Sequence, residues 1–325
     1  MGMAWFELGA ALLGACVGSF LNVVIWRLQQ AEPAHRSLGG RSHCPRCGAL
    51  IRWFDNIPVL SWGVLRARAR CCGGPISARY PLVELLTAGL FWWLATASPF
   101  GPVLVADPGS AKLGIDLTAA AAFALHAVYL ALLVSLSFID FDTKLLPDML
   151  TKPGIVLGVI AGLWPGLAGP LGDEVTMSPA LRNLLGSVAG LLAGGGVTWA
   201  IRAVGSAVFR KEAMGFGDVK LMMMIGAFLG WQAALLTMFL GCLLGALGGG
   251  IGVLFGRGNE IPFGPYLALG SLLAMFWEGS IVTALFTTWP ELQAKNPGAQ
   301  WLVLGVALVL LSALFCVVRR ARRST

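Results

Sequence analysis

Charged side chains are scarce in this 325-residue chain, where Asp, Glu, Lys and Arg together make up 12% of the residues. Soluble globular domains carry about 25% charged residues, so the composition excludes a water-soluble globular protein. Histidine is also scarce, with only His35, His43 and His126 present, which argues against a metal site built mainly from imidazoles. The chain is instead 57% hydrophobic and holds 43 glycines, as is common in transmembrane helices that pack closely.

Long apolar runs account for most of the sequence, and a helix needs about 20 apolar residues to cross a bilayer. We expect spans near 4–26, 81–98, 117–139, 153–170, 183–204, 219–230, 232–255, 263–286 and 299–318. The sixth is short, and we expect it to pack against the seventh across Gly230-Trp231. The predicted fold is therefore an all-α polytopic membrane protein with about eight or nine transmembrane helices.

The first apolar run, Met3 to Trp26, has neither a basic segment before it nor a small-residue cleavage site after it, so we expect a retained helix. The predicted organisation is a first transmembrane helix (1–26), a small cytoplasmic subdomain that contains cysteines (27–80), a multi-helix core (81–286), and an extra C-terminal helix with a basic tail (287–325). The loops 99–116, 171–182 and 287–298 are rich in Gly, Pro and Asp and are expected to be plain connections.

The formal net charge of +7 raises the question of nucleic-acid binding, but the positions of the basic residues favour another explanation. If the loop 27–80 is cytoplasmic and the spans alternate from there, 20 of the 23 Lys and Arg residues lie on the cytoplasmic side. Cytoplasmic loops of membrane proteins carry such an excess. We therefore predict a multi-pass inner-membrane protein in the lipid bilayer, with a periplasmic N-terminus, a cytoplasmic C-terminus and no nucleic-acid partner.

Four of the seven cysteines lie in the polar segment 27–80, and they are Cys44, Cys47, Cys71 and Cys72. Two CxxC pairs about 25 residues apart are typical of zinc sites, because four thiolates satisfy a tetrahedral Zn²⁺. The second pair would need a cysteine at position 69, where the chain has alanine. Either Cys71 or His43 supplies the fourth ligand, or the thiols hold no metal. A metal would help so small a segment to fold.

Two acidic stretches lie where polar sequence meets apolar sequence, and they are Ser137–Asp148 and Met214–Lys220. Asp140 directly follows an apolar run and is expected to lie deepest, whereas Asp142 is expected to be a solvated carboxylate at a helix end. Asp218 follows Gly215 and Gly217, which would let a substrate strand approach closely. Its pattern fits a helix N-cap as well as one member of a proton-sharing pair of carboxylates.

Several motifs in order resemble the prepilin (type IV leader) peptidases, which are membrane aspartic proteases of the GxGD class. The motifs are Gly18–Arg27, the CxxC loop, Trp53–Trp62, Pro75–Leu85, Ile139–Asp148, Gly215–Asp218 and Ile261–Pro265. The resemblance covers nearly the whole chain to about Trp277, and the extra apolar run 299–318 lies beyond it. It implies that Asp140 and Asp218 are the catalytic acids and that 81–286 is a peptidase core.

The resemblance also implies a substrate and a second activity. The substrates would be type IV prepilins or type II secretion pseudopilins, cut after the Gly that ends a short basic leader, at the cytoplasmic face. N-methylation of the new N-terminal residue with S-adenosylmethionine is linked in this family to the segment that carries the Cys loop. The alternatives are a protease-only member with a vestigial Cys loop, and an ion-coupled transporter.

Glu84 lies just inside the second predicted span. Ionisable residues within membrane segments are costly and are functional candidates by default. Glu84 is therefore a candidate for binding the methyl donor or the substrate amine, and pairing with a nearby arginine is the structural alternative.

Overall fold

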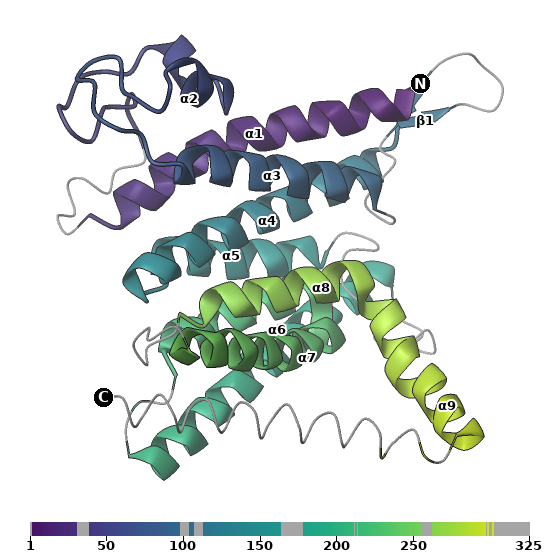
Figure 1. Cartoon of the computed structure of the whole chain (residues 1–325). Helices are drawn as coiled ribbons and strands as arrows, with labels where there is room; N and C mark the ends of the chain where they lie inside the picture. The colour runs from purple at the N-terminus through teal and green to yellow at the C-terminus, as the bar shows by residue number, and fades with distance from the viewer. Residues whose placement is uncertain are drawn as a thin grey trace.

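A computed structural model of the chain describes residues 2–30, 39–97, 104–106, 113–163, 178–210, 212, 214–254, 262–296, 298 and 301 (Figure 1). The helices in this part are α1 (Gly2–Leu28), η2 (Trp53–Asn56), α2 (Leu60–Val64), α3 (Arg79–Thr96), α4 (Leu117–Thr143), α5 (Asp148–Ala161), α6 (Pro179–Phe209), α7 (Phe216–Leu254), α8 (Gly264–Thr283), the π-helical turn η3 (Ala284–Thr288) and α9 (Trp289–Lys295). Two short strands, β1 (Leu104–Ala106) and β2 (Leu113–Ile115), pair antiparallel.

Five helical segments of the described residues are long and apolar enough to cross a membrane. They are Trp5–Leu28, Leu117–Thr143, Pro179–Val208, Phe216–Gly252 and Gly264–Lys295. The chain is therefore a helical, multi-pass membrane protein. The total of eight or nine spans stays a prediction, because the expected span 299–318 and the second half of 153–170 lie outside the described residues.

The long helix α7 is interrupted at Gly230, whose backbone has φ 85° and ψ 177°. This conformation is open to glycine and strained for residues with a side chain. A Cβ on Gly194 of α6 would lie within 4 Å of both Met222 and Ala234, although residues 12 apart in a straight helix are about 18 Å apart. The two halves of α7 therefore fold back on each other, which confirms the expected break at Gly230-Trp231.

The described helices form two groups that meet along α4. In one group, α1 packs along α3, and both contact α4; in the other, α5, α6 and α8 pack around α7 (Figure 1). Buried residues from both groups form one continuous apolar core, in which Tyr129 of α4 makes a buried hydrogen bond with Ser271 of α8. The 39–78 segment sits at the end where α1 finishes and α3 begins (Figure 1).

The expectation of plain connections was wrong in part for two loops, 99–116 and 287–298. The loop 99–116 contains the β1–β2 hairpin, and its last residue, Asp116, caps α4 by accepting hydrogen bonds from the backbone of Thr118 and Ala119. The segment 287–298 continues α8 through η3 into α9. Pro290 does not end the helix, because it lies in the first turn of α9, where proline is tolerated.

The close crossing of α6 and α7 generates a stability prediction. A Cβ on Gly190 of α6 would overlap the backbone of Gly226 in α7, whereas a Cβ on Gly196 of the same helix would meet nothing within 4 Å. We expect Gly190→Ala to lower the free energy of unfolding by about 1–3 kcal/mol, because the two backbones must separate. Gly196→Ala is the matched control. Thermal unfolding in detergent compares them, and equal stability of the two variants would contradict the crossing.

Candidate active site

Asp140 lies in the last turn of α4 and is 5% exposed. Its Oδ2 accepts a hydrogen bond of 2.8 Å from the backbone N–H of Gly264, the first residue of α8. A Cβ on Gly264 would lie 2.8 Å from the same oxygen, closer than real contacts allow. The absence of a side chain at position 264 therefore lets the start of α8 approach the carboxylate of Asp140.

Asp218 lies in the first turn of α7 and is 8% exposed. Its carboxylate is hydrogen-bonded to the backbone N–H of Gly215 and lies close enough to Asp140 for the two negative charges to interact. A Cβ on Gly217 would lie 2.9 Å from Leu146, in the segment that follows α4. The absence of a side chain at position 217 thus lets the start of α7 lie against the segment that follows α4. Asp218 is inside the helix and is not its N-cap, because α7 begins at Phe216.

The other two acids of the first stretch make ion pairs. Asp148 is the first residue of α5 and pairs with Lys152 and with Lys220 of α7. Its hydrogen bonds to Lys152 and Lys220 hold the pKa of Asp148 below the ordinary value. Asp142 is exposed in the last turn of α4, as expected for a solvated carboxylate at a helix end, and it also pairs with Arg79.

Arg79, the first residue of α3, connects α3 to the end of α4. Its guanidinium pairs with Asp142, donates a 3.1 Å hydrogen bond to the carbonyl of Phe138 and lies 4.9 Å from the centre of the Phe138 ring. Gln29, just after α1, donates a further hydrogen bond of 2.7 Å to Asp142. These contacts fix the α4 residues on either side of Asp140 to the ends of α1 and α3.

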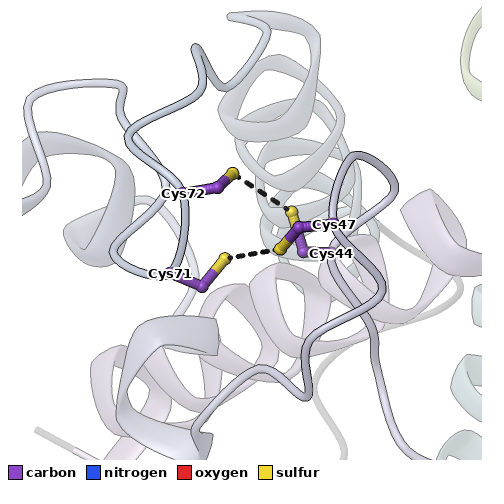
Figure 2. Close-up of side chains that lie close together, drawn as sticks. All are labelled: Cys44, Cys47, Cys71 and Cys72. Carbon is purple, nitrogen blue, oxygen red and sulfur yellow. Dashed lines mark hydrogen bonds between the residues drawn. The ribbon is translucent and has the colours of Figure 1, made fainter.

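The four cysteines of the 39–78 segment face one another across two turns (Figure 2). Their sulfurs all lie within 4.8 Å of one another, with Cys44 and Cys72 at 3.9 Å and Cys47 and Cys71 at 3.4 Å. Zn–S bonds of about 2.3 Å in a tetrahedron put the sulfurs about 3.8 Å apart. The arrangement therefore fits an ion of that size.

The two turns have the same backbone hydrogen bonds, which explains the departure at position 69. Cys44 N–H donates to Ala49 and its carbonyl accepts from Gly48, and Ala69 N–H donates to Gly74 while its carbonyl accepts from Gly73. Ala69 therefore occupies the position that corresponds to Cys44. Cys71, one residue before Cys72, brings the fourth sulfur into the cluster.

The electrostatics of the four thiols also favour a cation. Hydrogen bonds from the backbone of Cys47 and Arg46 lower the pKa of the Cys44 thiol to about 7. The hydrogen bond with Cys47 raises the pKa of the Cys71 thiol to about 12. Without a cation, four neighbouring thiols cannot all ionise, since like charges oppose one another. A bound divalent ion removes this opposition.

Glu84 of α3 is buried, and the expected alternative of an arginine partner was wrong. Its Oε2 accepts a 2.7 Å hydrogen bond from the backbone N–H of Val59, and its carboxylate is hydrogen-bonded to Ser19 of α1. Within the described ranges, it forms no ion pair. Sequence reasoning did not find the contacts of Arg79 and Gly264, because both depend on helices far apart in the chain.

Taken together, the fold and the site define a multi-pass helical membrane protein with two buried carboxylates at one end and a four-thiol cluster at the same end. Two family models match: Bacterial Peptidase A24 N-terminal domain over residues 12–98, and Type IV leader peptidase family over residues 127–250. The chain belongs to the type IV leader peptidase family.

Curated relatives carry the name prepilin leader peptidase/N-methyltransferase. The relative from Aeromonas hydrophila is 37% identical over 308 residues, which cover 86% of this chain and 94% of that protein. The relative from Pseudomonas aeruginosa is 37% identical and covers 85% of this chain and 92% of that protein. The relative from Myxococcus xanthus is 42% identical over 73% of this chain and 60% of its own length. No solved structure matches the chain.

The contact between Arg79 and Asp142 can be measured with a double-mutant cycle. We expect Arg79→Ala and Asp142→Ala each to destabilise the protein, and the double variant to be less unstable than their sum by about 1 kcal/mol or more, because the two side chains share a charge-assisted hydrogen bond. Reversible unfolding in mixed micelles gives the four free energies. Additive effects would show that the two side chains do not interact.

Proposed function

We propose that this chain cleaves the short basic leader of type IV prepilins or type II secretion pseudopilins after glycine, and then N-methylates the new N-terminal residue with S-adenosylmethionine. The observation that carries the proposal is the burial of Asp140 and Asp218 at one end of the bundle, in a chain of the type IV leader peptidase family. The names of its relatives supply both activities.

The peptidase reaction follows from two carboxylates in one site. Because neighbouring like charges oppose ionisation, the pair holds one proton between its members. The ionised member takes a proton from the attacking water, and the protonated member donates to the scissile carbonyl. The backbone N–H groups of Gly264 and Gly215 hold Asp140 and Asp218 in place from the starts of α8 and α7.

The membrane sidedness and domain limits are part of the proposal. The basic residues favour a periplasmic N-terminus, with the paired acids and the C-terminus on the cytoplasmic side. We assign 27–80 to the cytoplasm, 81–286 to the peptidase core and 287–325 to an additional C-terminal segment. Both acids lie at helix ends, whereas transporter sites typically lie near the midplane of the bilayer. This position favours a peptidase over an ion-coupled transporter.

The four-thiol cluster is proposed to bind one zinc ion through Cys44, Cys47, Cys71 and Cys72. A closed set of four thiolates is typical of a structural zinc site, which contributes folding free energy and leaves no open position for catalysis. The ion would therefore hold the two turns of the 39–78 segment together.

Substitution of either acid tests the peptidase proposal. In membranes incubated with a candidate prepilin, we expect Asp140→Asn and Asp218→Asn each to lower the rate of leader cleavage by about 100-fold to 10,000-fold, because each removes one partner of the acid–base pair. N-terminal mass analysis of the pilin measures cleavage and methylation together.

Asp116→Asn is the matched control, since Asp116 lies at the opposite end of α4 and asparagine can still cap the helix. This variant should cleave normally. Normal cleavage by Asp218→Asn or Asp140→Asn in a properly inserted protein would refute the paired-acid mechanism.

Zinc binding is tested by moving a ligand. We expect Cys71→Ala to lose the bound zinc, because the fourth sulfur is removed. Adding Ala69→Cys to this variant should restore zinc binding, since position 69 matches that of Cys44 in the first turn. Metal analysis of the purified protein measures the content. Cys242→Ala in α7 is the control, and full zinc content in Cys71→Ala alone would contradict the four-thiol site.

A further inference from the structure

A cavity of about 560 Å³ lies between the 39–78 segment and the adjoining ends of α1 and α3. Pockets of about 300–1,000 Å³ are typical of small-molecule sites. Its walls include Trp26 of α1, Trp62 of the 39–78 segment and Tyr80 of α3, while Ser19 and Glu84 supply polar groups. We call it the subdomain cavity. The Asp140–Asp218 peptidase mechanism makes no use of it.

Glu84 is an acid of this cavity that forms no ion pair within the described part of the chain. It is 7% exposed, and its neighbours in hydrogen-bonding contact are the neutral N–H of Val59 and hydroxyl of Ser19. Asp55, also on the cavity wall, is instead paired with Arg70. A buried carboxylate is costly unless a cation accompanies it. The cavity wall also carries four arginines, Arg27, Arg46, Arg52 and Arg70, but among the described residues none of them forms an ion pair with Glu84. A cationic group on a ligand is therefore a group that can pair with this carboxylate.

The backbone that contacts Glu84 is strained. Val59 has φ 61° and ψ −49°, which is a rare conformation for a β-branched residue. Such strain is found where the surrounding structure holds a residue in place for a function. Here it directs the N–H of Val59 at one oxygen of Glu84. The carboxylate is therefore held from two sides, by Val59 and by Ser19.

We propose that the subdomain cavity is the site of methyl transfer and that Glu84 is a catalytic residue, which accepts a proton from the amino-terminal ammonium of the cleaved substrate. The inference rests on the proposed function, which supplies both the amine and the methyl donor. Proton transfer gives a neutral carboxylic acid and a neutral amine. The amine nitrogen then attacks the donor's methyl carbon, and the carbon–sulfur bond breaks with its electron pair going to sulfur. The products are a methylated ammonium and a neutral thioether.

Two cations take part in this reaction, the substrate ammonium and the donor sulfonium, and the chemistry favours the ammonium as the partner of Glu84. An ammonium has no lone pair and cannot attack until it loses a proton, whereas the sulfonium needs no base. A positioned carboxylate supplies that base. The aromatic side chains of Trp26 and Trp62 on the cavity walls provide surfaces that suit a sulfonium.

The position of the cavity suits a substrate that has just been cut. Glu84 is on α3, five residues or about 1.4 turns after Arg79. Arg79 in turn pairs with Asp142, next to the Asp140 end of α4. The new amino terminus is therefore made and methylated at the same end of the helix bundle.

The test uses Glu84→Gln in the full-length protein in membranes, with a prepilin and S-adenosylmethionine. Glutamine keeps an oxygen that can accept from Val59 but cannot take a proton from an ammonium. We expect leader cleavage to remain within about 2-fold of wild type and methylation to fall by about 100-fold or more. The affinity for S-adenosylmethionine, measured by binding of radiolabelled donor, should remain unchanged. Glu278→Gln, a partly buried acid of α8, is the matched control and should retain both activities.

The outcomes separate this inference from the proposed function. Normal methylation by Glu84→Gln overturns the inference, while the wild-type activities stand. Loss of donor binding in this variant also overturns it, since Glu84 would then hold the donor and not the amine. If the wild-type protein cleaves but never methylates, the methylation part of the proposed function fails, and the inference fails with it. Loss of methylation with retained cleavage and donor binding supports the role of Glu84.

Discussion

The structure depends on the satisfaction of buried carboxylates at one end of an apolar helix bundle. Removing a carboxylate from water is costly unless hydrogen-bond donors or cations replace the water. Asp140 is held by the backbone N–H of Gly264, Asp218 by the backbone N–H of Gly215, and Glu84 by the backbone N–H of Val59. Because these donors come from different parts of the chain, satisfying the acids requires the ends of several helices to meet.

Glycine makes that meeting possible. The N–H of Gly264 reaches Asp140 because glycine has no Cβ, and a Cβ at this position would overlap the carboxylate. On α1, a Cβ on Gly18 would lie 2.7 Å from the backbone of Glu84, so the helix that carries Ser19 can approach α3 closely. Lipid tails are as apolar as the helices, so the hydrophobic effect does not drive helices together in a bilayer. They associate through close packing instead, which small residues such as glycine allow. The abundance of glycine in the sequence therefore has a direct consequence for the site.

Local sequence patterns predicted much of this fold, but they could not predict contacts between residues that lie far apart in the chain. Apolar runs gave the helices, the Gly230-Trp231 pair gave the break in α7, and the motif order indicated the two acids. The sequence did not reveal that Asp142 is paired, because its partner Arg79 is 63 residues away. It also left the fourth sulfur ligand open. In the second turn Ala69 occupies the position of Cys44, and Cys71, two residues further on, supplies the fourth sulfur instead.

The shared end of the bundle gives a physical reason for two chemistries in one chain. A peptidase that cuts before a hydrophobic segment creates an amino terminus at the membrane boundary, and that terminus is charged and poorly suited to the bilayer. A third buried carboxylate, Glu84, forms no ion pair with any residue that the structure describes. In the proposed methyl transfer, pairing the ammonium with Glu84 would lower the desolvation cost of both charges. The contacts of Arg79 with Asp142 and Phe138 hold the start of α3, the helix of Glu84, against the end of α4, the helix of Asp140.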